Sequence, residues 1–501
     1  MIGTSSLEYV WVVTWVIVLH SIGPLCAIYC ATATFLPKYL RAWRYLEYLA
    51  VTETVFYFIT YAYRKHHLQH PALHPSPLSK EQRSQRFHLC FDNSQDFATS
   101  FLRWFLDTPI DALKRENVKE WLRWAFLNTE TADPNHDDEL DTYVKHLEAK
   151  LGVDFEPGRA NVQSIRLTLD RVDALHRSLT WYACVSVVDV LTHVYMCVHG
   201  FHFYRGSIAH SISIMPPRPQ ALTTTHRSPN RNMSYWYQPH TSQKELPIVF
   251  LHGIGVGLYP YMPLLKEVNM CRQNEDGKIG ILAVEILAIS SRITATAPRK
   301  EDMCNQLRSV LRYHGIERFV LVSHSYGSVI STHLLKTPDL ARQISSVILV
   351  DPVSILLHQP DLVYNFTVRT PKFANEWLFW YFGSKDIGVA HTLSRTFFWA
   401  ENILWKEDLF VHHATVFLSG KDSIINAPQV RRYLEDIEEH GADKGPDQDE
   451  AKGHEQSMPG LRKRGSLEVV WCADLDHGQV FDLAAWRERL KIEILRKARR
   501  V

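Results

Sequence analysis

The hydrophobic pattern divides the chain into two parts. In residues 1–230, long apolar runs alternate with polar and proline-bearing stretches, and their length is typical of helices. From about residue 231, short β-branched runs alternate with helix-length segments, which is typical of an α/β domain with a parallel sheet. The sequence therefore predicts a transmembrane helix over residues 9–37, a helical region over residues 40–230, part of which fits association with a membrane, and an α/β domain over residues 231–500.

Short apolar runs in the second part predict the strands of a mostly parallel sheet with helices on both faces. These runs are Met233–Gln238, Ile248–Leu251, Ile279–Ile286, Phe319–Val322, Val347–Asp351, Thr415–Leu418 and Leu467–Trp471. Strands of a parallel sheet are buried on both faces, so their sequences read as nearly continuous hydrophobic runs. Residues 354–413, between the fifth and sixth runs, are rich in aromatic side chains and predict a helical insertion.

The stretch of residues 9–37 carries no formal charge. At about 1.5 Å per residue it more than spans a hydrocarbon core of about 30 Å, so we expect a transmembrane helix. Basic residues follow it, at Lys38, Arg41 and Arg44, and by the positive-inside rule these stay cytosolic. The expectation is a signal anchor in an endomembrane such as the endoplasmic reticulum, with a cytosolic catalytic domain.

Three further segments admit more than one interpretation. Tyr45–Tyr63 and Ser178–Tyr204 are apolar but contain carboxylates, among them Glu53 and Asp189, so helices that do not span are favoured. A second span would invert the topology. Thr99–Asn128 is amphipathic and aromatic, and fits either a bilayer surface or a helical hairpin packed on the protein.

Composition excludes several classes of function. The chain has 501 residues and a net charge of +1, which argues against a general nucleic-acid binder. Its eight cysteines show no spacing typical of structural zinc. Gly253, Gly255 and Gly257 lack the spacing of a dinucleotide-binding fingerprint, so we do not expect a dinucleotide cofactor. We expect no other cofactor and no metal. Nothing in the sequence sets the oligomeric state.

One turn carries the strongest chemical signal. The apolar run that ends at Val322 is followed by Ser323-His324-Ser325-Tyr326-Gly327 and then by a helix-like segment. This arrangement is that of a nucleophile elbow, in which a strained strand-to-helix turn exposes a serine Oγ above the sheet. Small residues are needed two positions before and after Ser325, and Gly327 meets this need, while Ser323 stands where glycine is usual.

Several loops at strand ends resemble those of the α/β-hydrolase superfamily, and the resemblance covers residues 231–495. It rests on the His252-Gly253 loop, the Ser325 turn, Gly420-Lys421-Asp422 and Asp476-His477-Gly478, which occur in this order along the chain. The resemblance implies an α/β-hydrolase fold in which the insertion 354–413 forms a helical cap. It also implies a nucleophile, acid and base in the order Ser325, Asp422, His477. Asp351 also ends a strand and is the rival acid.

The chemistry of acyl transfer explains why these residue types are needed. A serine hydroxyl requires a base to take its proton, and His477 is the candidate. A carboxylate holds the imidazole in the correct tautomer, a role that we assign to Asp422. Two backbone N–H groups stabilise the oxyanion of the intermediate, and the resemblance points to those of Tyr326 and Ile254.

These features predict a membrane-anchored serine hydrolase that cleaves a carboxylic ester of an apolar or lipid substrate. The aromatic insertion 354–413 suits such a substrate, although its rings also suit packing of the insertion itself. An acyltransferase or thioesterase would use the same three side chains. A different class of function, a non-catalytic membrane scaffold with this fold, gains some weight from Ser323 at a glycine position.

Overall fold

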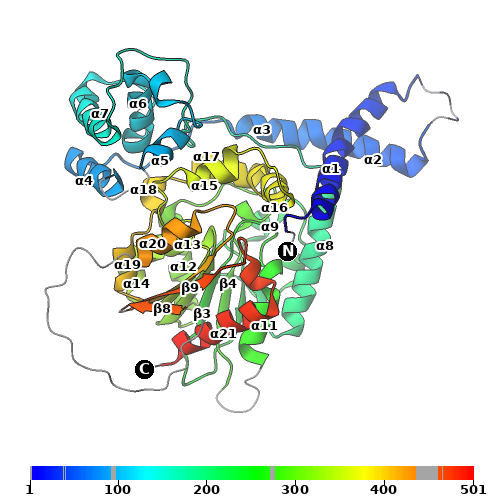
Figure 1. Ribbon diagram of the computed structural model, residues 1–501. Helices are drawn as coiled ribbons and strands as arrows, with labels where there is room; N and C mark the ends of the chain where they lie inside the picture. The colour runs from blue at the N-terminus through cyan, green and yellow to red at the C-terminus, as the bar shows by residue number, and fades with distance from the viewer. Residues whose placement is uncertain are drawn as a thin grey trace.

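The computed structural model describes residues 3–500 except 36, 38, 40, 92–96, 271–276, 436–460 and 465, so Lys38 lies outside the described residues. An α/β body contains the C-terminal half of the chain (Figure 1). A cluster of helices lies over one end of this body, and two further helices, α1 (Ser6–Thr32) and α2 (Arg44–Val55), cross beside it and project outward (Figure 1).

The body is built on one sheet, which has nine strands in the described part of the chain, in the order β1-β2-β4-β3-β5-β6-β7-β9-β8. Strand β2 is antiparallel to both neighbours and β8 is antiparallel to β9, whereas all other pairings are parallel. The strands are β1 (His202–Tyr204), β2 (Tyr235–Gln238), β3 (Ile248–Leu251), β4 (Ile281–Val284), β5 (Phe319–His324), β6 (Ile344–Val350), β7 (His413–Ser419), β8 (Leu461–Arg464) and β9 (Leu467–Cys472).

Helices cover both faces of the sheet because successive strand residues point to opposite sides. On β3, Val249 and Leu251 pack with the helices on one face, while Ile248 and Phe250 pack with those on the other. The first face is covered by α12 (Lys300–Tyr313), α13 (Gly327–Leu335), α14 (Pro338–Ala341) and α20 (Ala427–Glu435). The second is covered by α11 (Met262–Met270) and α21 (Ala484–Ala498).

The predicted strands all occur, and the α/β-hydrolase fold expected from the sequence is confirmed. Strands β1 and β8 were not expected. Strand β1 is three residues long and forms the end of the apolar run Ser178–Tyr204, so it does not stand out as a separate hydrophobic run. Strand β8 lies in a charged stretch and is not hydrophobic. The sheet thus begins at His202, before the change of pattern at residue 231.

A helical cap is inserted between β6 and β7, as the aromatic stretch predicts. Its helices are α15 (Asp361–Val363), η8 (Tyr364–Val368), α16 (Ala374–Leu378), η9 (Phe379–Ser384), α17 (Ile387–Arg395), α18 (Trp399–Asn402) and α19 (Lys406–Phe410). The cap lies over the ends of the strands at which β5, β6 and β7 finish (Figure 1).

The remaining α- and π-helices of the described chain lie before β2. They are η2 (Phe56–Ala62), α3 (Tyr63–His67), α4 (Lys80–Phe91), α5 (Phe97–Arg103), α6 (Arg115–Leu122), η4 (Arg123–Leu127), α7 (Asp137–Leu151), α8 (Leu179–Val198), α9 (Ile208–Ile212) and α10 (Gln220–Thr223). The aromatic residues of Thr99–Asn128, among them Phe101, Trp104 and Trp121, are buried in a separate core with α4 and α7. This segment is therefore a packed helical hairpin and does not present its rings to a bilayer.

Two described helices, α1 and α8, are long and apolar enough to cross a membrane. The carboxylates in the apolar segments are paired with protein groups. Glu53 is fully buried and accepts hydrogen bonds from the backbone N–H groups of Leu179 (2.7 Å) and Thr180 (2.9 Å) at the start of α8. Asp189, in the middle of α8, forms a buried, bidentate ion pair with Arg292 of the α/β body. These contacts offset the cost of burying the carboxylates and fix α8 to the body.

Candidate active site

Ser325 lies in the turn between β5 and α13, in the strained conformation expected of a nucleophile elbow. Its φ is +50°, which non-glycine residues rarely adopt. The turn is compact because α13 starts against β3: a Cβ added at Gly327 would lie 2.4 Å from the carbonyl oxygen of Leu251. Only glycine fits there, which explains the residue two positions after the serine.

Ser323 occupies the position where the motif usually has glycine. It is fully buried, and its Oγ accepts a hydrogen bond of 2.8 Å from the hydroxyl of Ser331, one turn into α13. Ser323 has a hydroxyl that glycine would lack, and this hydroxyl is hydrogen-bonded within the protein. The turn accommodates this departure without losing the geometry of the elbow.

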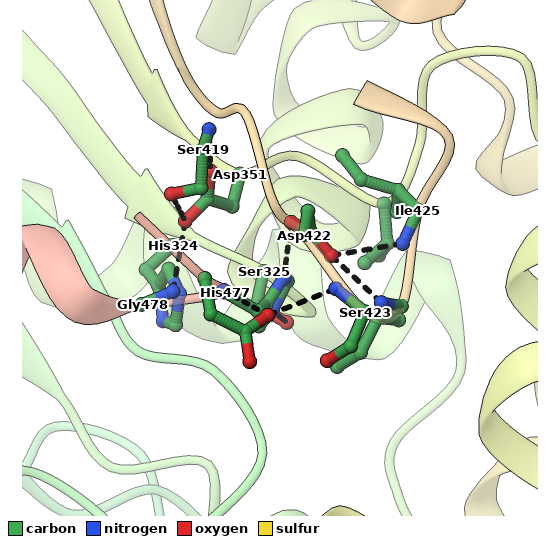
Figure 2. Close-up of polar contacts among 12 residues, drawn as sticks. His324, Ser325, Asp351, Ser419, Asp422, Ser423, Ile425, His477 and Gly478 are labelled. Carbon is green, nitrogen blue, oxygen red and sulfur yellow. Dashed lines mark hydrogen bonds and ion pairs between the residues drawn. The ribbon is translucent and has the colours of Figure 1, made fainter. Parts of the chain in front are cut away.

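His477 and Asp422 lie next to Ser325 although all three are far apart in the sequence (Figure 2). His477 Nε2 lies 2.8 Å from Ser325 Oγ, and His477 Nδ1 lies 2.7 Å from Asp422 Oδ2. The tautomer with its proton on Nδ1 satisfies both bonds, because Nδ1 then donates to the carboxylate and Nε2 accepts from the hydroxyl. The side chains of His477 and Asp422 are 4% and 0% exposed, so water does not compete for these bonds.

Asp422 is oriented by its own loop. Its second oxygen, Oδ1, accepts hydrogen bonds from the backbone N–H groups of Ile424 (2.8 Å) and Ile425 (2.9 Å). The carboxylate is thus held from one side by two amides and faces His477 with the other oxygen (Figure 2).

Asp351, the rival acid, lies close to this site but is bonded differently. Its carboxylate accepts from the backbone N–H and the hydroxyl of Ser419, at 2.8 and 2.9 Å, and from the backbone N–H of Gly478 at 2.8 Å. It therefore anchors the loop that carries His477, while Asp422 contacts the imidazole itself. One ligand atom each of Asp351, Asp422 and His477 lies within 4.8 Å of the others, so two carboxylates face one imidazole.

This arrangement alters the protonation of the site. Burial alone would lower the pKa of His477, but the charge of Asp422 and its hydrogen bond outweigh burial and raise that pKa above the ordinary value. Burial, reinforced by the charge of Asp422, raises the pKa of Asp351. Burial keeps the neighbouring His324 neutral by lowering its pKa, so a second positive charge beside His477 is avoided.

Asp476, just before the histidine, connects three parts of the site. Its Oδ1 accepts from the backbone N–H of Ser423 (2.9 Å) in the acid loop and of His477 (2.7 Å). Its Oδ2 accepts from the side-chain amide of Asn375 (2.6 Å) on the cap helix α16. The acid loop, the histidine loop and the cap are thus held in register by one buried carboxylate.

The loop after β3 carries Ile254, whose N–H was expected to face the oxyanion together with that of Tyr326. Within the described residues, neither N–H group donates a hydrogen bond, and both residues border the space beside Ser325. The loop is held by Tyr261, a residue that no motif of the sequence singles out. Its hydroxyl accepts from the N–H of Gly253 (3.1 Å) and lies 2.7 Å from Nδ1 of His324.

A cavity of about 550 Å³ extends from Ser325 and His477 beneath the cap. Its lining is mainly aliphatic and aromatic, and the ring of Phe379 stands at 90° to the ring of His477, with centroids 6.0 Å apart. Side chains from outside the α/β body also line it: Trp11 and Trp15 of α1, and Trp181 of α8. Nothing in the hydrophobic pattern of the sequence connects these N-terminal helices with the site.

No family model and no curated protein matches the chain. Among solved structures, a membrane phospholipase A described as a bacterial virulence factor is similar at 10% identity with a TM-score of 0.38, over 64% of this chain and 94% of that one. A putative lipase from Acinetobacter baumannii AYE has 11% identity and a TM-score of 0.36, over 62% and 96%. Naproxen esterase from Bacillus subtilis has 15% identity and a TM-score of 0.30, over 52% and 87%. At this similarity none of them carries an argument about the substrate of this chain.

Proposed function

We propose that this chain, which has the α/β-hydrolase fold, is a membrane-attached serine hydrolase that cleaves a carboxylic ester of an apolar substrate. One observation carries the proposal: the continuous hydrogen-bonded path from Ser325 Oγ through His477 to Asp422, with spacings of 2.8 and 2.7 Å, at the base of an apolar cavity. Such spacing is what general-base activation of a serine requires.

In the proposed reaction, Ser325 Oγ attacks the ester carbonyl while His477 Nε2 takes the hydroxyl proton. The tetrahedral intermediate collapses, the alkoxide leaves with the proton from His477, and an acyl-serine remains. Water then attacks the acyl-serine, again giving a proton to His477, and the carboxylic acid departs as the serine regains its proton. Asp422 holds the imidazole and stabilises the imidazolium formed in both halves.

The oxyanion of the intermediate is assigned to the backbone N–H groups of Tyr326 and Ile254. The first follows the nucleophile directly, and the second lies on the loop that Tyr261 holds through Gly253. Donors of this kind are already in place when charge develops on the carbonyl oxygen, and one of them is worth about 2.7–4 kcal/mol in a characterised protease. The reaction as written requires no cofactor or metal.

Attachment to a membrane is proposed for α1 because of its length and apolarity. One face of α1 packs on the cap through Val12 and Val16, which lie in one cluster with Ala374 and Tyr381. The helix is thus held by the catalytic domain along part of its length. The endomembrane location and the cytosolic side of the catalytic domain stay predictions.

The test is turnover of a p-nitrophenyl ester series by the full-length protein purified in detergent. We expect the wild type to hydrolyse these esters and Ser325→Ala to lose the activity. Ser309→Ala is the control, since that hydroxyl lies on α12 and donates to the carbonyl of Gln306 within its own helix. Equal turnover by the wild type and Ser325→Ala would refute the mechanism, and no turnover by the wild type would favour the scaffold hypothesis.

A further inference from the structure

Helix α1 packs against the cap of the α/β body and also lines the cavity beside Ser325. Val12 and Val16 are buried, at 2% and 5% exposure, in the cluster with Ala374 and Tyr381 of the cap. The side chains of Trp11, Val12, Trp15 and Leu19, one helical turn apart along α1, line the cavity that contains Ser325. An element outside the α/β body therefore completes a wall of the candidate active site.

Trp11 and Trp15 mark the boundary between this cavity and the outside. Both line the cavity, and yet they are 58% and 48% exposed. Their rings meet edge to face, with centroids 6.4 Å apart. A side chain that borders a cavity and is also half exposed stands at an opening, so one opening of the cavity lies at this pair of indoles.

The surface around the entrance is apolar. Helices α1 and α8 lie on the same side of the body (Figure 1), and Trp181 at the start of α8 lines the cavity beside them. Large hydrophobic side chains on the outer faces of the two helices are exposed: Leu7, Val10, Val18, Val187, Val190 and Leu191. Extended apolar surface of this kind is rare on soluble monomers and is typical of contact with a bilayer. Tryptophan is enriched where helices meet the membrane–water boundary, which is also the depth of lipid ester bonds.

The charge of the cavity restricts the headgroup. Among the described residues that line it there is no lysine or arginine, whereas Asp482, an exposed carboxylate, borders it. A phosphate group held in the cavity beyond the reach of His477 would meet no lysine or arginine among these lining residues. Phosphate sites in proteins rely on such cations or on convergent backbone N–H groups, so this lining favours an uncharged headgroup.

We propose that the cavity takes the acyl chain of a neutral lipid ester, of the acylglycerol class, that enters from a bilayer past Trp11 and Trp15, and that Leu19 forms part of the wall that limits the length of the chain. This inference rests on the proposed ester hydrolysis and specifies its substrate. The acyl chain lies against α1 and the cap, and the ester reaches Ser325 from the apolar side.

The first experiment compares kcat/KM for p-nitrophenyl palmitate and butyrate in full-length variants. Leu19→Trp fills part of the cavity and is expected to lower the palmitate-to-butyrate ratio at least tenfold, whereas Leu19→Ala raises it. Val18→Trp, an exposed position on the same helix at 45% exposure, keeps the ratio within twofold of the wild type. Loosening of α1 alone would move both Leu19 variants in the same direction, and that result would overturn the assignment of a chain-limiting wall.

The second experiment measures fatty-acid release in phosphatidylcholine vesicles that contain dioleoylglycerol, with the full-length protein reconstituted. We expect release from the diacylglycerol at least tenfold faster than from phosphatidylcholine at equal mole fraction, and a loss of at least tenfold in the double variant Trp11→Ala/Trp15→Ala. Equal rates on both lipids would overturn the neutral headgroup, and an unchanged double variant would overturn the entrance. Turnover that survives in Ser325→Ala would instead refute the proposed function.

Discussion

The sheet edge that carries Ser325 and the helices that precede the sheet are stabilised in different ways. At the edge, Ser325, Asp422 and His477 each lie in the loop or turn that follows a parallel strand, so the carboxyl ends of β5, β7 and β9 bring them together. In the N-terminal part, α1 and α8 are positioned by contacts with residues far along the chain, such as Val12 with Tyr381 and Asp189 with Arg292.

The proposed function assigns different roles to the two regions. Reactivity depends on short loops fixed to a rigid sheet, and such loops orient side chains precisely. The shape and the entrance of the cavity depend on helices with apolar outer faces, whose positions rest on few polar contacts. Changes at the edge should therefore alter the chemistry, whereas changes in the helices should alter stability and the choice of substrate.

The largest effect is expected at the base. His477→Ala removes the group that accepts the hydroxyl proton, and we expect kcat for esters to fall about 10⁴–10⁶-fold. Circular dichroism should show an unchanged fold. A loss smaller than tenfold would mean that another group acts as the base, and the loops at the sheet edge would then not be the part of the molecule that determines reactivity.

The two carboxylates should differ in their effects. Asp422→Asn leaves the imidazole without its acceptor and should lower kcat about 10⁴-fold, as a wrong tautomer does in a serine protease. Asp351→Asn weakens the bonds to Ser419 and Gly478 and should lower kcat only about tenfold, in line with the loss of about one hydrogen bond. Steady-state kinetics of both variants checks this order, and the reverse order would make Asp351 the acid.

Substitutions in the N-terminal helices should lower the free energy of unfolding. Asp189→Ala leaves Arg292 buried without its partner, since the two side chains are 8% and 4% exposed, and should lower the free energy of unfolding by about 3–5 kcal/mol. The matched control is Asp339→Ala, which breaks a surface pair with Arg308 at 46% and 29% exposure and should cost less than about 1 kcal/mol. Denaturant unfolding in detergent measures both, and equal effects would show that the buried pair does not fix α8.

The smallest effect concerns pH. Only neutral His477 accepts the serine proton, so kcat/KM should rise with pH through the pKa of His477. Asp422 raises that pKa, and the acidic limb should therefore lie above the ordinary histidine value of about 6.5. Residual activity of Asp422→Asn should show the limb at least about one pH unit lower, because the opposite charge is gone. A limb that does not move would contradict the electrostatic role of this carboxylate.

Most of the site could be predicted because its signals are local. The strand-turn-helix pattern around Ser325 and the strands before Asp422 and His477 are visible in the sequence, and parallel strands bring their carboxyl ends to one edge. The sequence alone does not decide whether Asp422 or Asp351 is the better candidate for the acid, because both lie after strands. Side-chain contacts favour Asp422, which is hydrogen-bonded to His477. The pairing of Ser323 with Ser331 likewise depends on how α13 packs against β5.

The contribution of the N-terminal helices could not be predicted, because hydrophobicity does not say what a helix contacts. Residues 9–37 read as a lipid-facing span, yet Trp11 and Trp15 also line the cavity. The carboxylates Glu53 and Asp189 argued against burial in a membrane-like environment, and their partners, the N-terminal amides of α8 and Arg292, lie more than 100 positions away in the chain. Such pairings are set by the tertiary fold alone.

Covalent labelling of the protein shows whether Ser325 is the nucleophile and whether His477 activates it. The full-length protein is treated with a fluorophosphonate, and the modified peptide is identified by mass spectrometry. We expect a single adduct on Ser325 in the wild type, none in Ser325→Ala and greatly slowed labelling in His477→Ala. An adduct on a different residue, or undiminished labelling of Ser325→Ala, would contradict this expectation.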